Sequence, residues 1–205
     1  MPVDSDEITT PQLALWRSEF GRAYTDRNDR ERPERMASWR RLLDGTAPAN
    51  VLEVGCNVGW NLVYLEELGL RDLYGIEPQP SAVAVARQRR PQFNVLHGTA
   101  FDLPFRDQMF DLVFTSGVLI HIAPGSLGRA LDEMYRVSRR WIAAIEYDDP
   151  TEQEIPYRGH AGALWKRDHG AAWQARFPGL RLVRRLALGA QHGYDDCTAH
   201  LFEKA

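Results

Sequence analysis

Lysine, cysteine and long apolar runs are scarce in this chain. Only Lys166 and Lys204 are lysines among its 25 basic residues, so the other 23 are arginines. The two cysteines, Cys56 and Cys197, show no CxxC or Cys/His spacing, which argues against a disulfide framework and against a metal site. No apolar run approaches the roughly 18 to 20 residues of a membrane span, and the first ten residues lack a signal-peptide pattern. We therefore expect a cytoplasmic protein.

The charge balance excludes one class of partner. The net charge is −3 and the isoelectric point is about 6.1, so no global basic field would attract nucleic acid or an anionic membrane. Hydrophobic residues make up 44% and charged residues 26% of the 205, which is typical of one folded domain. We expect a small-molecule partner, while the oligomeric state stays open.

Short apolar stretches alternate with amphipathic ones from residue 50 onward. We expect strands at 51–54, 72–76, 94–97, 111–115, 141–146, 180–188 and about 197–202, and helices at 60–68, 80–89, 126–138 and about 162–177. This alternation predicts an α/β fold with a doubly wound, mainly parallel seven-stranded sheet. The short connection at 189–196 predicts a hairpin, with the last strand antiparallel at the sheet edge.

The first 45 residues read differently from the rest. Apolar residues at helical spacing predict two helices, joined by an arginine-rich turn, with Pro33 at a helix start and Gly45 at a helix end. We interpret residues 1–45 as a helical cap of the same domain and residues 46–205 as the core.

A glycine-marked turn follows the first expected strand, in the sequence Val51-Leu-Glu-Val-Gly-Cys-Asn-Val-Gly59. Such a turn lets a cofactor lie against backbone amides at a helix N-terminus. Glu77 ends the next strand, 24 residues after Glu53, at the spacing where an acid reaches both hydroxyls of a ribose. A dinucleotide-binding fold would show a similar turn, so the turn alone leaves the cofactor open.

Two further segments resemble a known superfamily. The stretches His97-Gly-Thr-Ala-Phe-Asp-Leu-Pro-Phe105 and Phe110-Asp-Leu-Val-Phe-Thr-Ser-Gly117 resemble the adenine-contacting loop and fourth strand of class I S-adenosylmethionine-dependent methyltransferases, which have a Rossmann-like fold. Three more segments, 16–28, 117–122 and 157–168, look like the pseudaminic acid biosynthesis-associated methylases, with YRGH and LWKRD as the most specific elements. The resemblance implies methyl transfer from S-adenosylmethionine to an oxygen or nitrogen of a small polar metabolite in a specialised-metabolite or glycan pathway.

The resemblance also assigns cofactor contacts residue by residue. It implies that the cofactor is held by Glu53, Gly55, Asn57, Gly59, Asn61, Glu77, Pro78, Thr99, Ala100, Ser116 and Gly117. Thr99 stands where the commonest pattern has an aspartate, and Asn57 replaces a frequent glycine. No metal ion is expected.

The sequence also contains candidates for a general base and for substrate binding. His121 follows the fourth strand, and an imidazole with an unperturbed pKa of about 6.5 suits a general base, with Tyr24 as a second catalytic candidate. The substrate-binding candidates are Tyr24, Arg27, Asn28, Glu146, Tyr157, Arg158, His160, Lys166 and Arg167. Two alternatives stay open: the histidine only orients a loop, and the charged residues only join the cap to the core. Acids at the end of the fifth strand could also receive an amine, so the charge of the substrate stays open.

Two other functions remain possible on this sequence. One is a non-catalytic regulatory protein that binds the cofactor without methyl transfer, and the other is a nicotinamide-dependent oxidoreductase. Preferential binding of nicotinamide dinucleotide over S-adenosylhomocysteine would establish the second.

Overall fold

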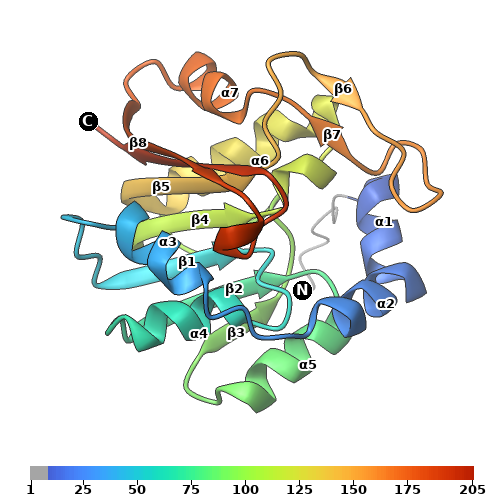
Figure 1. The fold of residues 1–205 in the computed structure, drawn as a ribbon, viewed down its shortest axis with the longest axis horizontal. Coiled ribbons are helices and arrows are strands. Elements are labelled where there is room, and N and C mark those ends of the chain that lie inside the picture. The colour runs from blue at the N-terminus through green and yellow to red at the C-terminus, as the bar shows by residue number, and fades with distance from the viewer. Residues whose placement is uncertain (1–8) are drawn as a thin grey trace, which may run out of the picture.

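A central sheet of seven strands organises the chain, as the computed structural model of residues 9–205 shows (Figure 1). Its strands are β1 (Asn50–Val54), β2 (Asp72–Glu77), β3 (Asn94–His97), β4 (Phe110–Ser116), β5 (Ser138–Glu146), β8 (Arg181–Leu188) and β9 (Cys197–Glu203), in the order β3-β2-β1-β4-β5-β9-β8. Strands β1 to β5 pair in parallel with one another, and β9 runs antiparallel to both β5 and β8. The predicted seven-stranded, mainly parallel sheet is confirmed.

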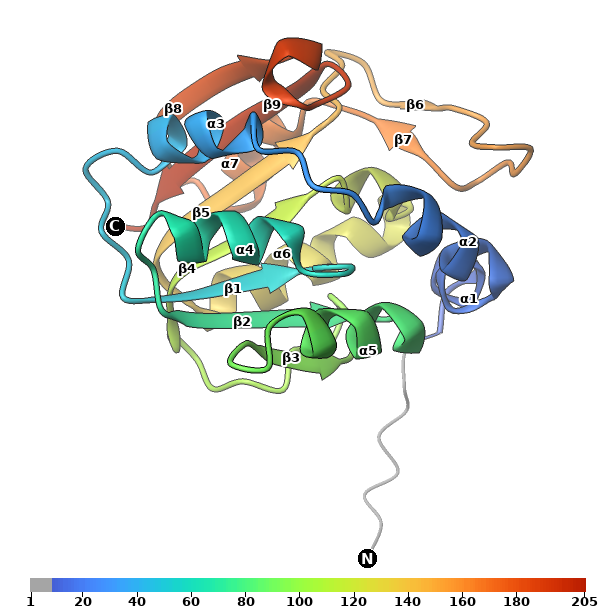
Figure 2. The same ribbon diagram turned by 60° about the horizontal axis from the view of Figure 1, so that its bottom comes forward.

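Helices cover both faces of this sheet. They are α1 (Pro11–Arg17), α2 (Glu19–Asn28), α3 (Arg35–Leu42), α4 (Trp60–Glu67), α5 (Pro80–Arg89), α6 (Pro124–Val137) and α7 (His169–Arg176), with a short 3-10 turn η1 at Leu119–His121 and another, η2, at Ala190–His192. Figure 2 shows α3, α4 and α5 over one face. Buried residues of α6 and α7 pack on the other face.

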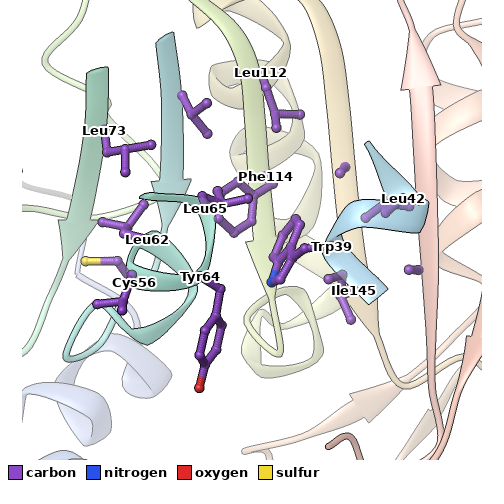
Figure 3. Close-up of a cluster of buried hydrophobic side chains, with 14 of the residues drawn as sticks. Trp39, Leu42, Cys56, Leu62, Tyr64, Leu65, Leu73, Leu112, Phe114 and Ile145 are labelled. Atoms are coloured by element: carbon purple, nitrogen blue, oxygen red, sulfur yellow. The ribbon is translucent and has the colours of Figure 1, made fainter. Parts of the chain in front are cut away.

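Each face of the sheet carries a hydrophobic core, and alternate side chains of a strand point into one core or the other. In β4, Leu112 and Phe114 point to the α3–α5 side, and Val113 between them points to the α6 side. Figure 3 shows Trp39 of α3 beside Phe114, and the two rings meet edge to face with centroids 4.7 Å apart. A buried aromatic pair of this kind fixes α3 on the sheet.

The residues expected to form one cap divide into two groups. Helix α3 packs on the sheet through Trp39 and Leu42, both of which are fully buried. The pair α1–α2 lies instead at the carboxyl end of the parallel strands, to the right in Figure 1. Ser18 separates the two helices, since its extended backbone ends α1 and its hydroxyl accepts a hydrogen bond from Phe20 N in α2.

Two predictions about the C-terminal third are wrong. The last strand is not at the sheet edge, because β9 inserts between β5 and β8 and leaves β8 at the edge. The helix expected at about 162–177 begins only at His169, where the side chain of Asp168 caps it. Trp165–Lys166 form strand β7 instead, paired with β6 (Gln153–Glu154) in a two-stranded ribbon.

No helix among residues 9–205 has both the length and the apolar character needed to cross a membrane.

Gly21 sets how closely α1 and α2 approach. A Cβ at this position would lie 1.8 Å from the carbonyl oxygen of Trp16, so the Gly21→Ala variant must separate the two helices. We expect a loss of about 1 to 3 kcal/mol in stability, typical of overpacking, together with faster amide hydrogen exchange in α1 and α2. Gly125→Ala in α6 is the matched control, because nothing lies within 4 Å of its added Cβ. Equal exchange rates in the two variants would contradict this packing.

Candidate functional site

A cavity of about 390 Å³ opens at the carboxyl ends of β1, β2 and β4. The chain passes from β1 outward to β2 and β3 and then returns to β4 beside β1, so the cavity lies at the point where the strand order reverses. Open α/β sheets bind ligands at this point. The predicted site residues that line it are Tyr24, Asn28, Glu53, Gly55, Asn57, Asn61, Glu77, Pro78, Thr99, Ala100, Ser116, Gly117, His121, Tyr157 and Arg158.

The turn after β1 is held open by left-handed backbone. Gly55, Asn57 and Gly59 have φ angles of 77°, 46° and 80°, a region that glycine and asparagine tolerate best. This explains why asparagine can stand at position 57 in place of a glycine. Gly59 is the residue before α4 and does not itself line the cavity.

Glu77 at the end of β2 ties two loops together. Its two carboxylate oxygens accept hydrogen bonds of 2.9 Å from the backbone amides of Asn57 and Gln79. The side chain is only 8% exposed, and this burial raises the pKa of Glu77 to about 7. The carboxylate is therefore fixed in orientation before any ligand arrives.

Glu53 is a second buried acid on the cavity wall. It accepts a 2.7 Å hydrogen bond from Asn61 Nδ2, and burial raises its pKa to about 8. Glu53 Oε2 and Asn61 Oδ1 are buried and have no hydrogen-bond partner among residues 9–205. Two unsatisfied acceptors side by side on a cavity wall fit a ligand that brings donors.

Glu146 does not line the cavity, contrary to its predicted contact with the substrate. It is completely buried and accepts hydrogen bonds from the amides of Val118 (3.2 Å) and Ile120 (3.4 Å). Burial raises the pKa of Glu146 to about 7. Its role is to hold the turn after β4, which carries His121.

His121 lies on the cavity wall with one ring nitrogen engaged. Its Nδ1 is 2.7 Å from the carbonyl oxygen of Ala163, and because a carbonyl only accepts, Nδ1 carries the proton. Nε2 is then the unprotonated acceptor. Burial lowers the pKa of His121 to about 4, so the imidazole is neutral at pH 7. It does not titrate near pH 7, contrary to the expectation from its unperturbed pKa.

An aromatic wall surrounds His121. Its ring lies 4.5 Å from that of Trp16 and 5.1 Å from that of Tyr157, and Tyr24 meets Trp16 edge to face at 5.0 Å. Burial raises the pKa of Tyr24 to about 12, so this phenol keeps its proton and can donate a hydrogen bond at neutral pH. Trp16 also lines the cavity.

Besides Glu146, four predicted substrate residues lie outside the cavity. Arg27 is exposed on α2, and His160 packs edge to face on Phe20 at 4.8 Å. Lys166 belongs to strand β7 and lies over the ring of Tyr147 at 5.9 Å. Arg167 is 3% exposed, donates to the carbonyl of Ile122 and pairs with Glu152, so it supports the loop instead of binding a ligand.

Several lining residues escaped the sequence interpretation. They are three arginines before and at the start of α3, the residue after β5, and two residues near the β8–β9 connection: Arg30, Arg32, Arg35, Tyr147, Tyr194 and Cys197. Arg35 donates to the carbonyl of Gly193 at 2.9 Å and covers the ring of Tyr194 at 4.2 Å. The arginine-rich turn was visible in the sequence, but only the fold brings it to the cavity.

Comparison with known proteins supports a methyltransferase. Residues 52–140 match the family described as a methyltransferase domain. An uncharacterized methyltransferase of Synechocystis is 36% identical over 87 residues, which are 42% of this chain and 41% of that protein. A demethylmenaquinone methyltransferase of Listeria welshimeri is 33% identical over 119 residues, 54% of this chain and 48% of that protein. The chain thus matches about half the length, or less, of these curated relatives.

Solved structures share the whole fold. The 1,6-didemethyltoxoflavin-N1-methyltransferase of Burkholderia thailandensis, solved with 1,6-didemethyltoxoflavin and S-adenosylhomocysteine bound, aligns with a TM-score of 0.74 at 19% identity and covers 100% of this chain and 94% of its own. A Pyrococcus horikoshii protein aligns with a TM-score of 0.68 at 17% identity, over 92% and 99% of the two chains. The Rossmann-like methyltransferase fold is therefore established.

The buried position of Glu53 predicts a pH-dependent stability. Because its folded pKa is raised above the unfolded value, the folded state holds this proton more tightly, and that contribution to stability is lost as pH rises from about 4.5 to 8. Glutamine does not ionise, so the free energy of unfolding of Glu53→Gln should rise relative to that of the wild type by about 1.4 kcal/mol per pH unit over this range. Urea denaturation at pH 5.5 and 8 measures the difference, with Glu67→Gln on the exposed side of α4 as control. A pH-independent difference for Glu53→Gln would contradict the raised pKa.

The contact with Ala163 predicts the tautomer of His121. Nitrogen-15 NMR of the imidazole should show the Nδ1–H form, with Nε2 unprotonated, throughout pH 5.5 to 8. Protonation of Nε2, or a titration centred near pH 6.5, would show that this nitrogen is not a free acceptor.

Proposed function

We propose that this protein is an S-adenosylmethionine-dependent methyltransferase that methylates an oxygen or nitrogen of a small polar metabolite. The observation that carries the proposal is Glu77, a buried carboxylate with both oxygens fixed by backbone amides at the edge of the cavity. The methyltransferase-domain match over residues 52–140 and the structural neighbour with S-adenosylhomocysteine support the same cofactor.

The residues present fit this cofactor. Glu77 can accept from the ribose hydroxyls, and the unsatisfied Glu53 Oε2 and Asn61 Oδ1 can accept from the ammonium group of its methionine end. Arg32 and Arg35 offer guanidinium groups for its carboxylate. Thr99 and Ala100 border the adenine end, with Thr99 Oγ1 accepting a hydrogen bond from Phe101 N and keeping its own proton to donate. When bound, the cofactor supplies a methyl group activated by its sulfonium sulfur.

The remaining lining residues position the acceptor. His121 Nε2, held unprotonated by the contact of Nδ1 with Ala163, takes a proton from a hydroxyl or ammonium nucleophile. Tyr24 keeps its phenol proton and donates to the acceptor, while Trp16 and Tyr157 exclude water. Glu146 acts through the turn that it holds, as a positioning residue. In-line transfer needs this kind of fixed geometry more than a strong base.

Finer parts of the proposal rest on the sequence resemblance. These are the placement among the pseudaminic acid biosynthesis-associated methylases, a specialised-metabolite or glycan pathway, and a cytoplasmic location. The YRGH and LWKRD elements support the narrower placement, since Tyr157 and Arg158 line the cavity and Ala163, between the two elements, contacts His121. A non-catalytic regulator would bind the cofactor without turnover. A nicotinamide-dependent oxidoreductase would bind nicotinamide dinucleotide instead.

Glu77 provides the direct test. Calorimetric titration with S-adenosylhomocysteine should show micromolar binding to the wild type at pH 8, and Glu77→Gln should weaken it by about 1 to 3 kcal/mol, because hydrogen bonds to a charged group are lost. Wild-type affinity should fall between pH 8 and 6, since the ribose hydroxyls favour the ionised carboxylate and its pKa is about 7. The Gln variant should lose the part of this dependence that comes from Glu77.

Glu67→Gln is the control for charge alone, because Glu67 is exposed on α4. Absence of S-adenosylhomocysteine binding to the wild type would overturn the proposed function. Equal binding by the wild type and Glu77→Gln would remove Glu77 from the ribose site.

A further inference from the structure

Three exposed residues mark where the cavity meets solvent. Among its lining residues only Arg30, Arg158 and Asp195 are exposed, and all the others are buried or half-buried. They come from three separate loops: the loop after α2, the loop between β6 and β7, and the β8–β9 connection. An incoming acceptor passes these groups first.

The charges around the cavity do not balance. Four arginines line it, namely Arg30, Arg32, Arg35 and Arg158, against the acids Glu53, Glu77 and Asp195. The cofactor of the proposed function adds one carboxylate but also a sulfonium and an ammonium. The cavity of a chain with net charge −3 therefore stays positive, which favours an anionic ligand.

The backbone of Arg158 adopts a conformation that is unfavourable for a residue with a long side chain. Its φ is 50°, that of Gly159 is 85°, and the backbones of Tyr157 and His160 exchange hydrogen bonds of 2.9 and 3.0 Å. These are the marks of a type I′ turn, whose first central position prefers asparagine, aspartate or glycine. An arginine held in this left-handed conformation is strained, and such strain collects at functional sites.

Arg158 and the proposed base His121 both contact the ring of Tyr157. Its Cζ lies 5.8 Å from the ring centre of Tyr157, and that ring is 5.1 Å from the ring of His121. No carboxylate of residues 9–205 forms an ion pair with Arg158. A guanidinium without an ion-pair partner on the cavity wall is available to a ligand.

We infer that the methyl acceptor carries a carboxylate or phosphate group that Arg158 binds at the cavity mouth, while its protic nucleophile faces His121. This inference rests on the proposed function. A planar guanidinium suits either anion, because both accept two parallel hydrogen bonds. In the transfer, the nucleophile bonds to the methyl carbon as the carbon–sulfur bond breaks, sulfur keeps the electron pair, and the nucleophile's proton passes to His121 Nε2.

The test replaces Arg158 by the residue that the turn itself prefers. Arg158→Asn creates an Asn-Gly sequence, the favoured pair for a type I′ turn, so its melting temperature should equal or exceed that of the wild type. Citrate and pyrophosphate serve as carboxylate and phosphate probes, titrated by calorimetry into protein saturated with S-adenosylhomocysteine. At least one probe should bind the wild type and lose tenfold or more in affinity in Arg158→Asn. Arg106→Asn is the control, because Arg106 is exposed and does not line the cavity.

Each outcome decides the inference. Loss with citrate only assigns a carboxylate, loss with pyrophosphate only assigns a phosphate, and loss with both supports the shared chemistry. Equal probe affinity in the wild type and Arg158→Asn, or no probe binding at all, overturns it while normal S-adenosylhomocysteine binding leaves the proposed function intact. If S-adenosylhomocysteine does not bind, the proposed function fails, and the same titrations without it still decide whether Arg158 binds anions.

Discussion

Three buried carboxylates near the carboxyl ends of parallel strands fix the segments that form the inner wall of the cavity. Glu53, the last residue but one of β1, binds Asn61; Glu77 ends β2 and binds the amides of Asn57 and Gln79; Glu146 ends β5 and binds the turn before His121. Helix α4 and the segments after β1, β2 and β4 are thus bound to acids whose pKa values are raised by burial. Without these ties, short loops rich in left-handed backbone would not hold one conformation.

The α1–α2 pair is connected to the same system. Gln79 Nε2 donates to the carbonyls of Trp16 and Ser18, at the junction of the two helices, and the hydroxyl of Thr25 donates to Asn57 Oδ1 at 3.1 Å. Gln79 and Asn57, which carry these contacts, both donate their backbone amides to Glu77. The α1–α2 pair and the Glu77 carboxylate therefore belong to one hydrogen-bond network beside the cavity.

Local patterns in the sequence predicted what depends on local physics. Strand β3 and helix α5 fall at the expected boundaries, and the glycine turn and Glu77 were found because spacing along βαβ units fixes which residues meet at the sheet edge. Sequence could not order the last two strands, since a hairpin satisfies its own hydrogen bonds in either placement. It could not separate the exposed Arg158 from the buried Arg167 either, because Arg167 is held by the carbonyl of Ile122, 45 residues away in the chain. Arg32 and Arg35 were missed for the same reason.

The crystal structure of the protein with S-adenosylhomocysteine tests the account most directly. We predict that the ribose hydroxyls lie within hydrogen-bond distance of Glu77, that the ammonium group contacts Glu53 or Asn61, and that the turn at residues 55–59 keeps its present conformation. A ligand bound elsewhere, or a turn that must rebuild to admit it, would contradict the claim that buried strand-end acids form this site in advance.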